Sequence, residues 1–244
     1  LPVAMKAMKA GKHVLCEKPL GMNAAEVREA IEVSEKMGVL FVEASWNRWH
    51  PRTQRVHEIV RSGKLGAIKR IRTAFTYSGL DDANIRLDPT IGGGILYDLG
   101  PYSTVAPLWL LDFPKVENLS VQAVFHEGGV DETTRVNYKL GNTVCETVAS
   151  CNIPDSSWFI VEGEKGSVRM GGMNAFNSHN APSDLEIEID GVTTIENFRG
   201  CDPYQLMADA FAGRARGGSD SVMPLSESLR FAELFDASFA LMKK

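Results

Sequence analysis

The stretch Glu17-Lys18-Pro19 places two charges directly after an apolar run, residues 13–16. A lysine held at the end of a strand can donate a hydrogen bond to a substrate hydroxyl and lower the pKa of a neighbouring acid. In an open parallel sheet, ligands bind outside the carboxyl ends of the strands. The ordinary alternative for Lys18 is a solvated lysine, because most lysines are exposed.

Asp98 and Tyr102 form a second candidate pair. They lie four residues apart in a segment with a helical pattern, so we expect them to face the same side. Three consecutive glycines, residues 92–94, precede them and allow the backbone to pass close to a ligand. The alternative is structural, with Asp98 interacting with a helix dipole and Tyr102 packed in a core. Spacing alone favours that alternative.

Three further polar residues are candidates for binding. Asn84 and Arg86 lie in the loop before the glycines and are suited to substrate hydroxyls. Arg48 lies between Trp46 and Trp49, where it either reaches a bound ligand or stacks on a tryptophan ring.

The first 45 residues must position Lys18, and they alternate helix and strand. Helices are predicted over residues 3–9 and 24–37, and strands over 13–17 and 39–44. Short connections between alternating elements are typical of a doubly wound parallel sheet. Two strands cannot complete such a sheet, and no G-x-G-x-x-G phosphate loop occurs in the sequence. Either the fold is different or the start of the domain is missing.

The pattern changes after Ser45, where we place a domain boundary. Later helices are predicted over residues 52–62, 95–111, 203–214 and 225–242. A strand is predicted over residues 67–77, and seven more follow closely between residues 116 and 198, with turn sequences such as Asp190-Gly191 between them. This succession predicts an α+β domain with a large, mainly antiparallel sheet packed on helices.

The composition excludes several classes of protein. The chain has 244 residues, 44% of them hydrophobic, which suffices for one large or two ordinary cores. Its 26 basic and 31 acidic residues give a net charge of -5, so nucleic acid is not expected as a partner. No window approaches the ~20 apolar residues of a membrane span, and no signal peptide is recognised, which favours a cytoplasmic protein. The four cysteines show no zinc-type spacing, so no metal site is expected.

Three segments of the sequence carry a family resemblance. They are AGKHVLCEKPL (residues 10–20), NIRLDPTIGGGILYDLGPYSTVAPLWLL (residues 84–111) and MPLSESLRFAELFDASFA (residues 223–240). In this order and spacing they resemble three features of the glucose–fructose oxidoreductase, inositol dehydrogenase and rhizopine catabolism (Gfo/Idh/MocA) family. The first resembles the family signature, the second its glycine-rich turn and D-x-G-x-(H/Y) helix start, and the third its last helix. Tyr102 stands at the His or Tyr position, as in the dihydrodiol dehydrogenase and xylose dehydrogenase branch.

The resemblance implies a two-domain, NAD(P)-dependent oxidoreductase. Residues 1–45 would be the C-terminal part of a Rossmann-type dinucleotide-binding domain, with on the order of 80 residues missing before them. Residues 46–244 would be the substrate-binding and dimerisation domain. The implied reaction is hydride transfer between the nicotinamide of NAD or NADP and a CH–OH carbon of a sugar, cyclitol or dihydrodiol. The acid or arginine that distinguishes the two cofactors follows an earlier strand of such a domain.

The resemblance also implies roles for single residues. Tyr102 would accept the hydroxyl proton, with its pKa lowered by Lys18, and Asp98 would orient the substrate or the tyrosine. The remaining assignments are Glu17, Lys18, Pro19 and Arg48 to the cofactor, and Asn84 and Arg86 to the substrate.

Other functions of the same fold stay open. A non-catalytic relative could bind a sugar or a protein, a glycoside hydrolase could use NAD as a transient redox cofactor, and a lyase could use Lys18 as a Schiff base. The expected partners are a small polyol or sugar and a second copy of the chain, paired through the open face of the sheet. Neither nucleic acid nor a membrane is expected.

Overall fold

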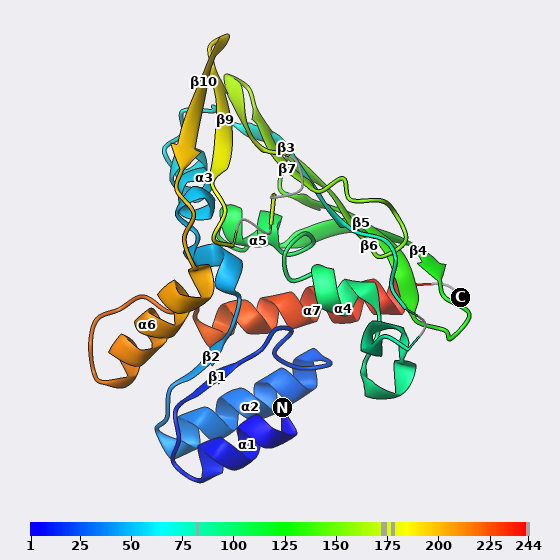
Figure 1. Cartoon of the computed structure of the whole chain (residues 1–244), viewed down its shortest axis with the longest axis vertical. Helices are drawn as coiled ribbons and strands as arrows, with labels where there is room; N and C mark the ends of the chain where they lie inside the picture. Colours follow the sequence, from blue (N-terminus) through cyan, green and yellow to red (C-terminus); the bar gives the residue numbers. More distant parts are fainter. Residues whose placement is uncertain (82, 172–174, 177–178, 243–244) are drawn as a thin grey trace.

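The computed structural model describes residues 1–81, 83–171, 175–176 and 179–242. Figure 1 shows a large sheet that crosses the molecule diagonally, with helices gathered on one side of it and a small two-stranded sheet beneath them. The site described below lies between these two parts.

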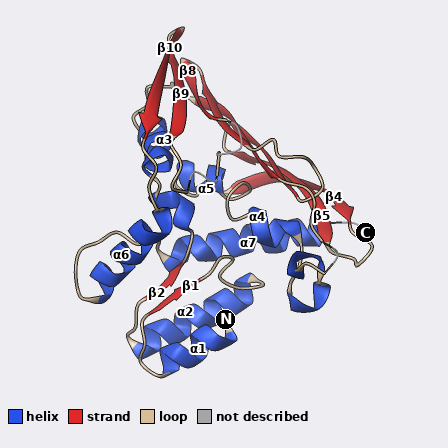
Figure 2. Cartoon of the chain, in the orientation of Figure 1, coloured by secondary structure: helices blue, strands red, loops and turns tan. Residues whose placement is uncertain are grey.

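The small sheet consists of two parallel strands, β1 (Val14–Cys16) and β2 (Phe41–Glu43). Two helices pack beside it, α1 (Pro2–Lys9) and α2 (Ala24–Met37) (Figure 2). The alternation of helix and strand predicted for residues 1–45 is therefore present. A small core of apolar side chains joins these elements and includes Ala4, Met8, Val27, Ala30 and Phe41.

The large sheet has eight strands in the order β10-β9-β8-β7-β3-β6-β5-β4. Neighbouring strands are antiparallel except β3 and β6, which run parallel. The strands are β3 (Ile68–Thr76), β4 (Val116–Phe125), β5 (Asp131–Leu140), β6 (Thr143–Ser150), β7 (Trp158–Gly163), β8 (Gly166–Met170), β9 (Ser183–Ile189) and β10 (Val192–Phe198).

Strand β3 is more buried than its sequence pattern predicts. Its alternation predicted a strand half exposed to solvent, but the four residues from Thr73 to Thr76 are all buried. The reason is position, because β3 lies in the centre of the sheet between β6 and β7. The loop after β6 also covers its end, where the Thr76 hydroxyl donates to the Pro154 carbonyl at 3.0 Å.

Helices cover one face of the large sheet and enclose the main core. The longest, α7, lies between the large and the small sheet (Figure 1). The helices are α3 (Pro51–Arg61), α4 (Ile95–Leu99), α5 (Ala106–Leu110), α6 (Pro203–Ala215) and α7 (Leu225–Leu241), with short 3-10 turns η1 (Trp46–Trp49), η2 (Ile85–Leu87) and η3 (Pro89–Ile91). Among the described residues, no helix is long and apolar enough to cross a membrane.

The single helix predicted over residues 95–111 is in fact two short helices, α4 and α5. Pro101 explains the break, because it has no backbone N–H to donate to the carbonyl four residues earlier. The chain between the helices keeps a turn structure in which the Ser103 amide donates to the Leu99 carbonyl at 3.0 Å. Tyr102 therefore lies in this connection and not inside a regular helix.

Candidate active site

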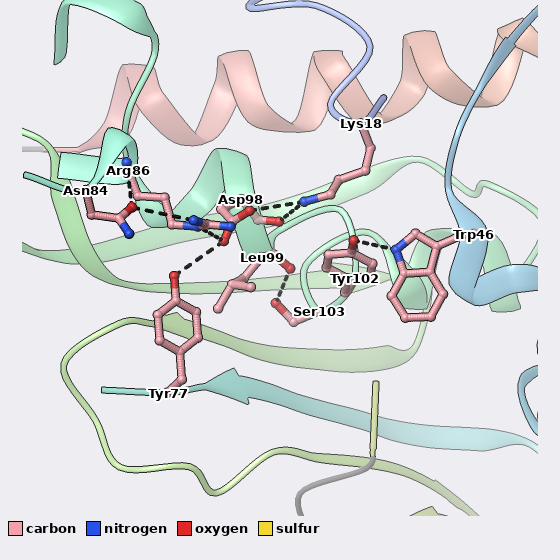
Figure 3. Close-up of polar contacts among 9 residues, drawn as sticks. All are labelled: Lys18, Trp46, Tyr77, Asn84, Arg86, Asp98, Leu99, Tyr102 and Ser103. Carbon is pink, nitrogen blue, oxygen red and sulfur yellow. Dashed lines mark hydrogen bonds and ion pairs between the residues drawn. The ribbon is translucent and has the colours of Figure 1, made fainter. Parts of the chain in front are cut away.

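Lys18 lies two residues beyond the carboxyl end of β1 and reaches across to α4. Its ammonium donates to the Asp98 carbonyl oxygen at 2.6 Å and to Asp98 Oδ1 at 3.2 Å (Figure 3). The side chain is only 11% exposed, which excludes the solvated strand-end lysine. Lys18 and Asp98 are 80 residues apart in the chain, so this contact joins the two parts of the molecule.

Asp98 accepts hydrogen bonds from three side chains. Besides Lys18, the Arg86 Nε donates to Asp98 Oδ2 at 2.6 Å, and the Tyr77 hydroxyl donates to the same oxygen at 3.4 Å (Figure 3). Burial opposes ionisation of this carboxyl, but the two nearby cations outweigh burial and lower the pKa of Asp98 below its ordinary value. Asp98 is thus an ionised carboxylate that holds two cations in place.

A buried aspartate and a glycine position the helix that carries Asp98. Asp131, at the start of β5, accepts from the backbone amide of Leu96 at 2.9 Å and from the Thr134 hydroxyl at 2.5 Å. Gly94 has φ 121° and lies against this carboxylate, because an added Cβ would be 2.4 Å from Asp131 Oδ1. Only glycine fits there. Sequence reasoning missed Asp131, since an isolated aspartate at a strand start gives no signal of its distant partner.

Tyr102 is buried beside Lys18 and Asp98. Its ring lies under the Lys18 ammonium, 4.6 Å from the ring centroid to Nζ, and its hydroxyl accepts from Trp46 Nε1 at 2.8 Å (Figure 3). The side chain is 6% exposed. The sequence therefore predicted correctly that Lys18, Asp98 and Tyr102 lie close together.

The expected effect of Lys18 on Tyr102 is not what the structure shows. Burial raises the pKa of Tyr102 well above its ordinary value, and the hydrogen bond from Trp46 lowers it only in part. The Lys18 ammonium is bonded to Asp98 and lies over the face of the phenol ring. Tyr102 is therefore a neutral phenol, and the expectation of a pKa lowered by Lys18 must be corrected.

The other predicted residues divide into two groups. Arg86 and Pro19 line the same cavity as Lys18 and Asp98, whereas Glu17 is exposed and does not line it. Asn84 supports the site indirectly, because its side chain accepts from the Arg86 amide at 3.0 Å.

Arg48 lies away from the cavity. Its guanidinium forms a 2.6 Å ion pair with Glu227 and lies 4.8 Å from the ring centroid of Trp109. The structure thus matches the stacking alternative, although the partner is Trp109 and the contact is largely buried.

The cavity beside the site has a volume of about 670 Å³. Lys18, Pro19, Gly93 and Asp98 line it together with Tyr97 and Arg86. Tyr97 was not predicted as a site residue. Its hydroxyl donates to the Met22 carbonyl at 2.6 Å and so links α4 to the loop after β1. Among the described residues, no group of three His, Cys, Asp or Glu side chains could hold a metal ion.

The residues present fit the nicotinamide end of a dinucleotide. The cavity opens at the carboxyl end of β1 in a parallel sheet, the position where such sheets bind nucleotides. Lys18 offers an ammonium donor, and the ionised Asp98 carboxylate offers a favourable charge to a cationic ring. Lys18 and Pro19 are the residues that would contact the group.

Family models match most of the chain. Residues 2–45 match an oxidoreductase family with an NAD-binding Rossmann fold, and residues 53–169 match the GFO/IDH/MocA C-terminal domain. An uncharacterized oxidoreductase of Rhizobium meliloti is 30% identical over 243 residues, covering 96% of this chain and 72% of the relative.

Two relatives have more specific names. D-xylose 1-dehydrogenase (NADP(+)) 2 of Haloferax volcanii is 32% identical over 237 residues, which cover 94% of this chain and 70% of that protein. The trans-1,2-dihydrobenzene-1,2-diol dehydrogenase of Mus musculus is 34% identical over 176 residues, which cover 69% of this chain and 51% of the mouse protein.

Solved structures share the fold. A 3-ketoreductase of Actinomadura kijaniata, solved with NADP and TDP-benzene, superposes with a TM-score of 0.88 at 22% identity and covers 98% of this chain and 74% of that chain. The aldose-aldose oxidoreductase of Caulobacter crescentus, complexed with glycerol, also gives 0.88, at 20% identity, and covers 98% of this chain and 72% of that chain.

The fold and these matches define an NAD(P)-dependent oxidoreductase. Within that class, the chain belongs to the GFO/IDH/MocA family, and its named relatives include the dihydrodiol and xylose dehydrogenases. The family, the branch and the fold class predicted from sequence are confirmed.

Proposed function

We propose that this oxidoreductase transfers a hydride between the nicotinamide of NAD or NADP and a CH–OH carbon of a sugar, cyclitol or dihydrodiol, and that Tyr102 exchanges the hydroxyl proton. The observation that carries the proposal is the contact between Lys18 and Asp98, which both line the cavity, with the Lys18 ammonium over the ring of the buried Tyr102. The names of the xylose and dihydrodiol dehydrogenases support this substrate class.

Tyr102 is the residue of this chain that would handle the proton. When bound, the nicotinamide supplies the hydride donor in carbonyl reduction and the hydride acceptor in alcohol oxidation. In reduction, the neutral Tyr102 phenol donates its proton to the substrate oxygen as that oxygen gains negative charge. In oxidation, the same group, first ionised, takes the proton from the substrate hydroxyl.

Lys18 and Asp98 would have electrostatic and positioning roles. The ammonium of Lys18 stabilises negative charge on the substrate oxygen, and Asp98 keeps that ammonium fixed through two hydrogen bonds. Asp98 also fixes Arg86 at the cavity wall, where its remaining N–H groups are suited to substrate hydroxyls. Asp98 thus orients the two cations; no hydrogen bond joins it to Tyr102 in this structure.

The test is a hydride-transfer assay on the protein expressed from the open reading frame that contains this chain. Polyols, sugars and dihydrodiols are offered with NAD or NADP, and the absorbance of the reduced nicotinamide is followed. We expect Tyr102→Phe and Lys18→Met each to lower kcat by a factor on the order of 10²–10⁴, the range for a lost acid–base group. Lys12→Met, a change of an exposed lysine before β1, is the matched control.

The same assay distinguishes the alternatives. Full activity of Tyr102→Phe and Lys18→Met would show that the site is assigned wrongly. Glycoside cleavage without net production of reduced dinucleotide would indicate a hydrolase, and tight sugar binding without any hydride transfer would indicate a binding protein.

We further propose that two copies of the chain associate through the outer face of the large sheet. Thr73, Tyr138 and Thr147 point toward the turn after α4, so their strand neighbours Ala74 and Val148 point to the opposite face. Trp158 of β7 and Val148 of β6, both half-buried, lie there on either side of Ala74 of β3; because Ala74 is buried, Trp158 and Val148 form the accessible apolar centre. Ion pairs flank this apolar centre, between Arg72 and Glu162 and between Arg70 and Glu146. An apolar centre with a charged rim is typical of an interface.

A further inference from the structure

Among the residues that the structure describes, Trp46 is the hydrogen-bond donor to the Tyr102 hydroxyl. Its indole N–H donates to Tyr102 Oη at 2.8 Å, and the two side chains are 4% and 6% exposed. Trp46 comes from η1, directly after β2, whereas Tyr102 comes from the turn after α4. Both residues belong to the main core, so the contact lies within the larger part of the molecule, next to the Lys18 contact that joins the two parts.

The chemistry of the indole fixes the direction of this hydrogen bond. An indole N–H is only a donor, so the Tyr102 oxygen must accept. The phenol O–H is then directed away from Trp46 and is available to another acceptor. An N–H donor also favours the ionised phenolate over the neutral phenol.

Packing holds the indole in this orientation. Tyr204 of α6 stacks on it, with ring centroids 4.6 Å apart and an angle of 21° between the planes. The Tyr102 ring lies against another edge, at 5.6 Å and 59°. Phe75 of β3 packs edge-on against Tyr102 at 5.5 Å, so both rings of the pair are confined.

We propose that Trp46 is a positioning residue for the proton transfer: its indole N–H fixes the Tyr102 oxygen so that the phenol proton points to the substrate, and it stabilises the phenolate needed for alcohol oxidation. This inference rests on the proposed function, because it assigns Trp46 a role through Tyr102. The titratable groups that act on Tyr102 include Lys18 over its ring and Asp98, Glu17, Tyr204 and Arg86 around it. None of these, in the structure, donates a hydrogen bond to the Tyr102 oxygen as Trp46 does.

The contact itself can be tested without measuring activity. Nitrogen-15 labelling of the indoles gives one N–H signal per tryptophan, and Trp46→Phe identifies the one from Trp46. We expect that signal to exchange slowly with solvent and to shift when Tyr102→Phe removes the acceptor. A Trp46 signal that does not respond to Tyr102→Phe would overturn the proposal.

The catalytic consequence is tested by the pH dependence of alcohol oxidation. Trp46→Phe removes the donor, and the limb on which kcat/KM rises with pH should move upward by on the order of one pH unit, the size of a hydrogen bond to a charged group. Replacement of Trp46 by benzothienylalanine keeps the ring shape without the N–H and should give the same shift. Val192→Ala, at an exposed valine of β10 outside the site, is the control and should leave the limb unmoved.

The outcomes separate this inference from the proposed function. If the wild-type protein transfers no hydride, the proposed function fails, and the role of Trp46 fails with it. If the wild type is active and the benzothienylalanine variant keeps the wild-type pH limb, only the role of Trp46 is overturned.

Discussion

Asp98 accepts hydrogen bonds from Lys18, Arg86 and Tyr77, which come from three different elements of the fold. Two positive charges, on Lys18 and Arg86, lie beside one negative carboxylate. Their attraction lowers the pKa of Asp98 in spite of its burial. The Asp98 carboxylate therefore stabilises the fold and also holds Lys18 and Arg86 in place in the proposed site. Its removal should affect stability in a way that depends on pH.

Asp98→Asn should lower the free energy of unfolding at neutral pH by roughly 1–3 kcal/mol, the range for hydrogen bonds to charged groups. Because the folded pKa of Asp98 is lowered, its contribution is present above the unfolded value of about 4 and is lost as the pH falls through the folded pKa. Denaturant unfolding of wild type and variant at several pH values measures this. The difference should shrink below about pH 4, while Asp209→Asn, at an exposed site on α6, should show none.

Tyr102 gives a second prediction at the residue scale. Alcohol oxidation needs the ionised phenol, and the pKa of Tyr102 is raised by burial, so kcat/KM for oxidation should still be rising in the alkaline range where an exposed tyrosine, with a pKa of about 10, titrates. The measurement is a pH–rate profile with a fixed alcohol. In Tyr102→Phe the residual rate should lose this limb, and a limb that survives the substitution would belong to another group.

Helix α4 shows how one short element depends on distant residues. The helix has only five residues and follows a glycine, so little in its own sequence stabilises it. The Asp131 carboxylate accepts a hydrogen bond from the Leu96 amide in the first turn of the helix. The same carboxylate occupies the position that a Cβ on Gly94 would take. The orientation of Asp98 and the path to Tyr102 are therefore set by a strand that follows them in the chain.

Gly94→Ala should destabilise the fold and disturb the site. An alanine at φ 121° is strained, and its Cβ would lie 2.4 Å from Asp131 Oδ1. We expect a loss of roughly 1–3 kcal/mol or more from backbone strain and the displaced carboxylate. Gly79→Ala is the matched control, because Gly79 also has a positive φ, 88°, but nothing lies within 4 Å of an added Cβ. Thermal unfolding of both variants separates the clash from the strain; equal losses would contradict the role given to Asp131.

At the scale of the whole molecule, the site is an interface between two differently built parts. Lys18 comes from the loop after β1 of the small sheet, whereas Asp98 and Tyr102, with Trp46 of η1 beside them, belong to the larger part. Helix α7 braces the same interface from another side, because Asp236 accepts from the Ala24 amide at 3.0 Å. The opposite face of the large sheet contributes none of the site residues named above, and it is the face of the proposed association.

The proposed association predicts an oligomer that one surface change disrupts. Val148→Asp places a charge in the apolar centre of the outer sheet face and should convert a dimer to a monomer, because a stable interface buries about 800 Å² per partner around such a centre. Sedimentation velocity over a concentration series measures the change. Leu206→Asp, at a leucine of α6 that is 40% exposed, should leave the oligomeric state unaltered. A wild-type protein that is monomeric at all concentrations would contradict the proposal.

Sequence reasoning was accurate where the signal was local. The hairpins of the large sheet follow their turn sequences, as at Asp190-Gly191 between β9 and β10. It was inaccurate where adjacent strands determine the burial of a strand, or where a single proline interrupts a helix. The second half of β3 is buried because of the strands beside it, and Pro101 divides a helix whose apolar pattern is continuous.

The sequence by itself determined the family, the order of the elements and the three central side chains of the site, because motif spacing, periodicity and turn residues are local properties of the chain. Only the tertiary structure decided what those side chains do to one another. In the folded chain Lys18 is hydrogen-bonded to Asp98, and the burial of Tyr102 raises the pKa of this tyrosine. Trp46 is the hydrogen-bond donor to the Tyr102 hydroxyl. These effects depend on burial and on distances between residues that are tens of positions apart, and no local pattern encodes them.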